Sequence, residues 1–171
     1  QPTTEFVSRR CMIPFEKLGG SGQTLHFLHA NGYPPAAYRP FLERLSGKYN
    51  VLAMRMRPLW PGTDPGGLQD WLPLIIDLEN FLVQQRLDKV NPDMPSPVGV
   101  GHSMGATITL CLALKRPELF SALALIDPVL FPSWGTIFSN ILSRLGLLYQ
   151  LHPLIKRTLH RRNQFESRQM M

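Results

Sequence analysis

The chain has 171 residues, of which 44% are apolar and 18% are charged, a composition typical of a globular protein that can bury one sizeable core. The formal net charge is +6, but residues 144–171 hold six Lys and Arg against one acid, whereas residues 1–143 hold twelve against eleven. This nearly neutral main part argues against a basic groove for nucleic acid. No apolar run reaches the roughly 18 residues of a membrane span. The basic C-terminal stretch could form an interfacial lid that meets anionic lipid, but we favour a solvated face and expect no membrane contact.

Strands and helices are predicted to alternate from the first residues onward. A first strand is expected within residues 7–17 and a second over 24–29, separated by a turn at 19–22 whose glycines tolerate positive φ. Apolar residues spaced by three and four positions predict a helix over 36–46. The next apolar run, residues 48–56, predicts a third strand.

The same alternation continues in the second half of the chain. A loop rich in Pro and Gly at 58–67 precedes a long helix whose apolar positions run from Leu72 to Leu82. A fourth strand is expected over 97–100, a helix over 107–115 and a fifth strand over 121–126. Apolar strands alternating with helices predict an α/β fold, with a mostly parallel sheet covered by helices on both faces. Such sheets place their sites at the carboxyl ends of the strands.

The two cysteines bear on the compartment. Cys11 and Cys111 lie 100 positions apart with no other cysteine near either, which predicts reduced, buried thiols rather than a metal knuckle or a redox pair. No charged-then-apolar signal segment opens the chain, so we interpret the protein as cytoplasmic. The first residue is Gln1 rather than Met, which leaves a removed signal as the alternative.

The run Gly101-His102-Ser103-Met104-Gly105 carries the clearest chemical signal. A serine hydroxyl is a weak nucleophile, so a fold must expose it, give it a base and supply donors for the oxyanion formed on attack. The two glycines stand where a side chain would collide as the backbone turns sharply from strand to helix. We therefore predict that Ser103 is a catalytic nucleophile on a tight strand-to-helix turn, and not part of a purely structural turn.

With its preceding strand and following helix, this turn resembles the α/β-hydrolase family, and the resemblance covers about residues 20–131. In that family the loop after an early strand commonly reads His-Gly-X-Pro. The run His29-Ala30-Asn31-Gly32 stands in that place with two substitutions, Ala30 for Gly and Gly32 for Pro. The resemblance implies that the backbone N–H groups of Asn31 and Met104 form the oxyanion hole, and His29 is interpreted as a structural residue that ties down its loop.

The resemblance also implies a reaction class. Relatives such as haloalkane dehalogenases and epoxide hydrolases use an aspartate nucleophile, whereas this chain has Ser103, which points to acyl transfer. We predict hydrolysis of a small-molecule carboxylic ester, thioester or lactone with an apolar group, with no metal and no organic cofactor. A cofactor-free perhydrolase is an alternative, because peracid formation can use the same serine and oxyanion hole.

The acid and the base are less clearly marked. The family order is serine, acid, histidine, so the strand-end Asp127 is a candidate acid, as in some relatives. The alternatives are that the acid lies one strand later, as in other relatives, or that Asp127 only forms a turn before its proline. His152 and His160 follow, but they lie in a basic stretch with helical spacing, whereas the base normally sits on a loop after a further strand. We therefore expect the catalytic histidine outside this chain.

Two domains and two functions follow from this interpretation. Residues 1–131 are predicted to form the N-terminal part of a hydrolase core whose C-terminal strands are missing, and residues 132–171 to form a truncated helical cap or lid. A cap would present an apolar side to the substrate, whereas the alternative is that its apolar residues pack on the core. The favoured function is that of a serine hydrolase, and the alternative is a non-catalytic ligand-binding module or inactive fragment that lacks the histidine.

Overall fold

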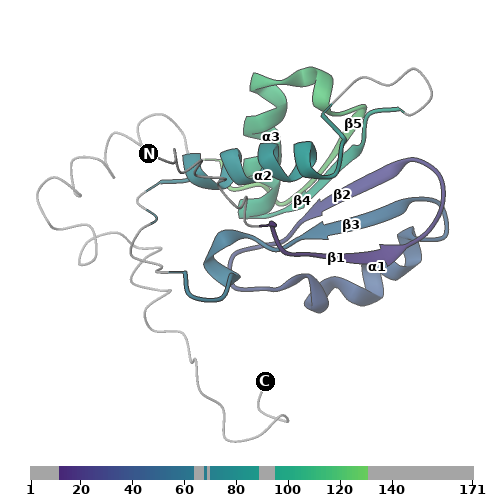
Figure 1. The fold of residues 1–171 in the computed structure, drawn as a ribbon, viewed down its shortest axis with the longest axis horizontal. Helices are drawn as coiled ribbons and strands as arrows, with labels where there is room; N and C mark the ends of the chain where they lie inside the picture. Colours follow the sequence, from purple (N-terminus) through teal and green to yellow (C-terminus); the bar gives the residue numbers. More distant parts are fainter. Residues whose placement is uncertain (1–11, 64–67, 69, 89–94, 131–171) are drawn as a thin grey trace, which may run out of the picture. The chain divides into compact units, whose positions relative to one another are not determined.

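The computed structural model describes residues 12–63, 68, 70–88 and 95–130, and within these ranges the strands form one five-stranded sheet (Figure 1). The strands are β1 (Phe15–Gly19), β2 (Thr24–Leu28), β3 (Asn50–Met54), β4 (Val98–His102) and β5 (Ala122–Ile126). Their order in the sheet is β1-β3-β2-β4-β5. The edge strand β1 runs antiparallel to β3, and the other three pairings are parallel. The predicted mostly parallel sheet is thus confirmed.

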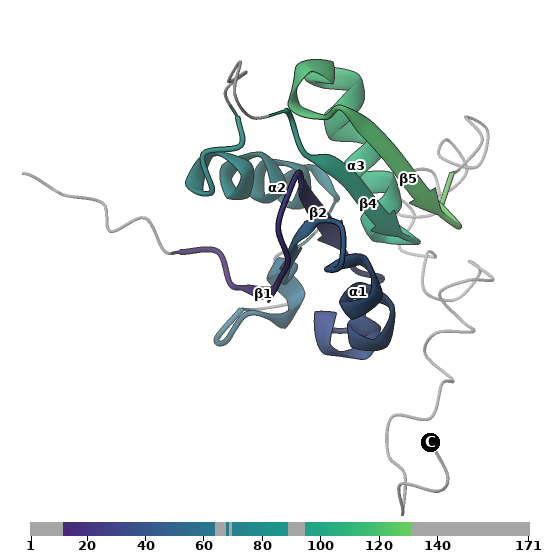
Figure 2. The same cartoon turned by 90° about the vertical axis from the view of Figure 1, so that its right-hand side faces the viewer.

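Helices cover both faces of this sheet, also as predicted. The α-helices are α1 (Arg39–Leu45), α2 (Leu72–Gln84) and α3 (Met104–Lys115), and the short 3-10 helices are η1 (Pro35–Tyr38), η2 (Arg57–Leu59) and η4 (Pro117–Leu119). Helix α1 lies on one face, and α2 and α3 lie together on the other (Figure 2). None of the helices in the described ranges is long and apolar enough to cross a membrane.

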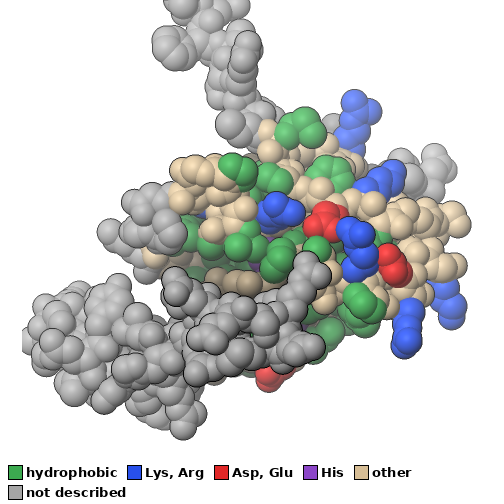
Figure 3. Space-filling view, turned by 90° about the horizontal axis from the view of Figure 1, so that it is seen from below, with side chains coloured by type: hydrophobic (Ala, Val, Ile, Leu, Met, Phe, Trp, Pro, Cys, Tyr) green, Lys and Arg blue, Asp and Glu red, His purple; other side chains and the backbone are tan. Residues whose placement is uncertain are grey.

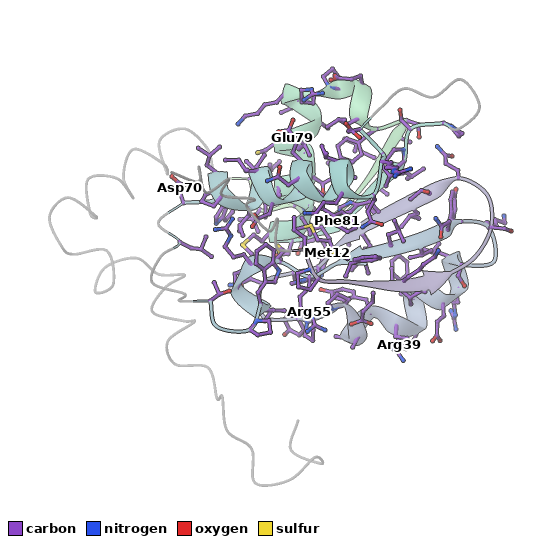
Figure 4. All side chains as sticks on the ribbon, viewed as in Figure 1. Met12, Arg39, Arg55, Asp70, Glu79 and Phe81 are labelled. Carbon is purple, nitrogen blue, oxygen red and sulfur yellow. The ribbon has the colours of Figure 1, made fainter. Side chains whose placement is uncertain are left out.

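Two cores result from the alternation of side chains along the central strands. On β2, Leu28 packs into the core beneath α2 and α3, whereas Phe27 packs with Leu42 of α1 into the core of the opposite face. Phe81 points from α2 toward the sheet (Figure 4) and is fully buried. Because the central strands are buried on both faces, they read as continuous apolar runs rather than as alternating ones.

The structure corrects several boundaries. Strand β1 begins at Phe15, and of the range predicted for it, residues 7–11 lie outside the described residues. Helix α3 begins at Met104 instead of residue 107, because its first turn, glycine included, is packed against the end of β2. Cys111 is free, as predicted, but it is half-buried and not buried. The predicted cap at 132–171 lies outside the described residues.

Strand β5 forms the edge of the sheet in the part of the chain that is described. It pairs with β4 on one side, and its side chains Leu123 and Ile126 are 37% and 42% exposed. A parallel strand in a covered position would bury such residues. The apolar sequence of β5 is therefore more suited to a central strand than to an edge.

His26 is a polar side chain inside the core beneath α2. Its exposed fraction is 0%, and neither ring nitrogen has a hydrogen-bond partner in the described residues. The ring instead lies against Phe81, with 5.7 Å between the ring centroids. Burial lowers the pKa of His26 from 6.5 to about 3, because the charged imidazolium would lose its solvation there. The folded protein therefore holds this ring neutral.

We expect His26→Leu to stabilise the protein by about 1–2 kcal/mol near neutral pH, because it removes two unsatisfied polar atoms. The folded pKa of His26 lies below the unfolded value, so the stability linked to the neutral ring is complete above about pH 6.5 and is lost as the pH falls toward 3. The variant should accordingly lose less stability in acid than the wild type. Urea unfolding at about pH 7.5 and 5 measures both effects, and equal acid losses in the two proteins would contradict the prediction.

Candidate active site

Ser103 alone connects β4 to α3, and its backbone is strained. Its φ of 53° and ψ of −119° lie in a region that residues other than glycine rarely adopt. The N–H of Ser103 donates to the carbonyl of Ile126 at 2.9 Å, and its own carbonyl accepts the N–H of Thr107 at 3.1 Å. The strained turn is thus held by β5 on one side and by the first turn of α3 on the other.

The two glycines around Ser103 allow the close contacts that this turn needs. A Cβ atom on Gly101 would lie 2.6 Å from backbone atoms of Ala106. A Cβ atom on Gly105 would lie 2.3 Å from the carbonyl oxygen of Leu28 and 2.5 Å from that of His29. Helix α3 therefore begins in direct backbone contact with the end of β2, and this contact brings the serine segment beside the loop that follows β2.

His29 fixes that loop from inside the protein. The side chain is 1% exposed, its Nδ1 lies 2.8 Å from the carbonyl oxygen of Ala30, and its Nε2 accepts the N–H of Met56 at 2.9 Å. Because Nε2 accepts, the ring proton lies on Nδ1 and is donated to Ala30. Burial is the main cause that lowers the pKa of His29, so the ring stays neutral. This is the structural role expected from the sequence.

The hydrogen bond from Nδ1 of His29 to the carbonyl of Ala30 also orients the backbone N–H of Asn31. A trans peptide unit is planar, so the carbonyl of Ala30 and the N–H of Asn31 point in opposite directions. The carbonyl of Ala30 accepts His29 and also the N–H of Tyr33 at 3.2 Å. Because His29 and Tyr33 hold this carbonyl, the orientation of the N–H of Asn31 is fixed as well.

Asn31 and Met104 line one cavity of about 270 Å³. The other described residues that line it are Pro58, Leu68, Asp70, Trp71 and Leu74. Within the described residues, the backbone N–H groups of Asn31 and Met104 donate to no other backbone group. Two residues from different segments, each with a backbone N–H that no described backbone group accepts, therefore line the same cavity, and one of them directly follows Ser103 in the chain.

The wall of this cavity is mostly apolar, and Asp70 is its one charged residue among those described. Asp70 stands at the start of α2 (Figure 4), where its Oδ1 accepts the N–H of Leu72 at 2.9 Å. An exposed carboxylate at this position disfavours a second negative charge in the cavity.

Arg57 and Asp77 join two walls of the cavity. Nε of Arg57 donates to Oδ2 of Asp77 at 2.8 Å and Nη2 donates to Oδ1 at 2.5 Å, and these bonds are the main cause that raises the pKa of Arg57. The guanidinium also lies over the ring of Trp60, 5.4 Å from its centroid. This pair fastens η2, which carries Pro58, to α2.

Asp127 lies at the same edge of the sheet as Ser103. It follows Ile126, which stands opposite His102 in the register of β4 and β5, and it is exposed with a φ of 46°. No hydrogen bond joins Asp127 to Ser103 in the part of the chain described. The strand-end position expected from the sequence is present, while its role as the acid stays a prediction.

None of the three histidines in the described ranges is positioned to act as the base for Ser103. His26 is buried in the core, His29 binds backbone groups through both ring nitrogens, and Nδ1 of His102 lies 2.8 Å from the hydroxyl of Tyr38. None of these rings is hydrogen-bonded to the hydroxyl of Ser103. His152 and His160 lie outside the described residues.

A model of the alpha/beta hydrolase family matches residues 27–170. The chain belongs to the alpha/beta hydrolase family. The (E)-2-((N-methylformamido)methylene)succinate hydrolase of Acinetobacter baylyi is 28% identical over 160 residues, which cover 93% of this chain and 57% of that protein. The type I acyl-CoA thioesterase mpaH of Penicillium roqueforti is 31% identical over 114 residues, which cover 60% of this chain and 25% of that protein.

The fold is also shared with solved structures. The crystal structure of E-2-(acetamidomethylene)succinate hydrolase superposes with a TM-score of 0.58 at 22% identity, covering 77% of this chain and 46% of that one. The hydrolase-family chain thus spans between a quarter and little more than half the length of these three proteins.

A second groove of the hydrolase-family chain has mixed charge. It measures about 440 Å³ and lies between β1 and α1, lined by Glu16, Lys17, Leu18, Arg39 and Glu43. Glu16 forms ion pairs with Arg39 at 3.4 Å and with Arg55 at 3.5 Å. Figure 3 shows acidic and basic side chains side by side on the face seen from below. The charges of this groove largely compensate each other, and none of its described lining residues also lines the cavity of Asn31 and Met104.

Sequence reasoning missed two features of the site. Asp77 interrupts the apolar side of α2 between Leu74 and Phe81, and a charged residue on a buried helix face signals a partner. The partner, Arg57, is 20 positions away and carries no local signal. The hydroxyl of Tyr38 has no local sequence signal for its partner His102 either, which is 64 positions away.

Proposed function

We propose that this chain forms the nucleophile-bearing part of a serine hydrolase. In the proposed reaction the hydroxyl oxygen of Ser103 attacks the carbonyl carbon of an ester, thioester or lactone, and a base takes the hydroxyl proton. The backbone N–H groups of Asn31 and Met104 stabilise the oxyanion. The leaving group departs with the proton, and water then hydrolyses the acyl-enzyme.

One observation carries this proposal: a strained serine stands at the carboxyl end of a parallel strand, and the residue that follows it, Met104, lines a cavity together with Asn31. The backbone N–H groups of these two residues donate to no other backbone group among the described residues. The cost of the backbone conformation at Ser103 needs a compensating role, and exposure of a nucleophile is such a role. A structural turn of glycines would not require a serine in this conformation.

The remaining parts of the mechanism follow the same logic. Asp127 is the proposed acid, because it follows the strand next to β4 at the edge where Ser103 lies. The base comes from residues outside those described. The apolar cavity wall supports a substrate with an apolar acyl or alcohol group, and Asp70 at its edge disfavours a carboxylate there.

The second candidate is a non-catalytic binding module of the same fold. The observation in its favour is that His26, His29 and His102 all have positions or partners other than Ser103 within the described ranges. Without a base, the cavity would bind a ligand and leave it unchanged.

Covalent labelling of the full-length protein distinguishes the two functions. We expect a fluorophosphonate probe to label the wild type and not Ser103→Ala, while turnover of a short-chain nitrophenyl ester falls about 1000-fold or more in the variant. Ser96→Ala is the matched control, because the hydroxyl of Ser96 bonds the carbonyl of Glu118 outside the site. Labelling that persists in Ser103→Ala would refute the assignment, and an unlabelled wild type would favour the binding module.

A further inference from the structure

The hydroxyl of Tyr38 lies between the two segments of the site. It accepts the backbone N–H of Ala30 at 3.1 Å and lies 2.8 Å from Nδ1 of His102. Ala30 precedes Asn31, and His102 precedes Ser103. One phenol oxygen thus links the residue before a proposed oxyanion donor to the residue before the proposed nucleophile.

The positions of the protons on the Tyr38 hydroxyl and the His102 ring follow from the number of donors and acceptors. The hydroxyl of Tyr38 accepts the N–H of Ala30, which leaves its own proton for Nδ1 of His102. In this arrangement all three groups are satisfied, and the ring proton of His102 lies on Nε2. If Nδ1 carried the proton instead, the proton of the Tyr38 hydroxyl would have no partner among the described residues.

The ring of Tyr38 is held so that its hydroxyl stays at this position. It packs on Phe27, with 4.8 Å between centroids, and meets the ring of His102 edge to face at 5.7 Å. The residue ends η1 directly before α1, so two helical segments anchor its backbone. A half-buried tyrosine held from both sides loses little further freedom when it forms the link.

The peptide units on either side of Ala30 are therefore both fixed, by different residues. The carbonyl of Ala30 is bound by His29, which orients the N–H of Asn31, and the N–H of Ala30 is bound by Tyr38. Among the described residues, only Tyr38 connects this loop, through a side-chain hydrogen bond, to the segment of Ser103. Oxyanion stabilisation depends on donors held at fixed positions, and small displacements weaken it strongly.

We propose that Tyr38 is a positioning residue for the Ser103 reaction: its hydroxyl, bonded to Ala30 and His102, sets the position of the Asn31 N–H relative to the serine. This inference rests on the proposed serine hydrolase function. It assigns to Tyr38 no contact with substrate. Its loss should slow the covalent step and leave substrate binding unchanged.

The test uses hydroxyl removal in the full-length protein. We expect Tyr38→Phe to lower the rate of covalent labelling at saturating fluorophosphonate, and kcat for a short-chain nitrophenyl ester, by about tenfold to a hundredfold, with KM unchanged. Tyr49→Phe is the matched control, because Tyr49 packs in the same core and its hydroxyl has no partner among the described residues. A Tyr38→Phe variant with wild-type labelling and kcat, or one with KM raised and kcat unchanged, would overturn the inference.

Substitutions of His102 test the second half of the link. His102→Leu removes the acceptor and should slow the covalent step, whereas His102→Gln keeps an acceptor and should retain most of the rate. The double variant Tyr38→Phe with His102→Leu should be no slower than Tyr38→Phe alone, since the same bond is removed once. A wild-type rate in His102→Leu, or additive losses in the double variant, would overturn the link.

Amide NMR signals, which do not depend on catalysis, test the structural coupling by Tyr38 separately from the proposed hydrolase function. In Tyr38→Phe, the amide NMR signals of Asn31 and Ser103 should both shift, while in Tyr49→Phe they should stay in place. An unlabelled wild type would refute the hydrolase function, and with it the role of Tyr38 in the reaction, whatever the NMR signals show. Unchanged signals at Asn31 or Ser103 in Tyr38→Phe would refute the coupling by Tyr38 alone.

Discussion

Gly105→Ala is expected to destabilise the protein by about 3 kcal/mol, at the upper end of what overpacking costs. The added Cβ would lie 2.3 Å and 2.5 Å from two backbone carbonyl oxygens at the end of β2, and backbone atoms cannot yield as a flexible side chain can. Either α3 or the end of β2 must move, and the loop of Asn31 follows β2. Gly105→Val should have a still larger effect. Urea or thermal unfolding measures the loss.

The expected loss of stability is opposite in sign to the usual effect of replacing glycine by alanine in a helix. In a helix, glycine to alanine ordinarily stabilises by about 1 kcal/mol, because alanine has the better helix propensity. Gly47→Ala is a control for the added Cβ alone: Gly47 lies in the turn after α1, where a Cβ would meet its nearest neighbour, the carbonyl of Arg44, at an ordinary 3.8 Å. We expect this control to be neutral or slightly stabilising. A Gly105→Ala protein as stable as the wild type would contradict the close contact between α3 and β2.

Arg57→Ala is expected to cost about 2–3 kcal/mol, because it leaves the carboxylate of Asp77 unpaired. The side chain of Asp77 is 5% exposed and that of Arg57 is 36% exposed. Because water partly solvates Arg57, the expected loss of stability is smaller than for a fully buried ion pair. The substitution also removes the contact with Trp60. Chemical unfolding measures the loss of stability. Esterase assays of the full-length protein measure whether turnover falls when η2 is no longer fastened to α2.

Two further proteins control this experiment. Arg116 also bonds two carboxylates, Glu79 and Glu118, but at the surface, and Arg116→Ala should leave stability unchanged. Replacing Arg57 and Asp77 together by leucine should recover stability relative to Arg57→Ala, because no charge is left buried. Equal effects of Arg57→Ala and Arg116→Ala would show that the buried carboxylate is not the cause.

The sequence predicts the parts of this protein that local rules determine. The spacing of Gly101 and Gly105 around Ser103 encodes a steric requirement of one turn, so the residues themselves place the turn. The apolar runs of β2 and β3 likewise indicate strands buried on both faces. The start predicted for α3 is three residues late, because a glycine at 105 argues against a helix interior unless its contact with β2 is taken into account.

The features that depend on pairing across the fold cannot be predicted in this way. Nothing in the sequence around Met56 marks it as a partner of His29, yet its N–H sets the tautomer of that ring. The link from Tyr38 to His102 spans 64 positions, and that from Arg57 to Asp77 spans 20. Such pairs are set by strand order and helix packing, which periodicity does not encode.

The hydrogen bond from the N–H of Ser103 to the carbonyl of Ile126 has a consequence for how the protein can be monitored. This amide proton is protected only while the end of β5 is docked on β4, so its exchange with deuterated solvent follows the opening of that strand pair. Because β5 is the edge of the described sheet, any segment or molecule that pairs with its outer side should slow this exchange. The backbone of the proposed nucleophile thus reports on the integrity of the neighbouring strand without any chemistry taking place.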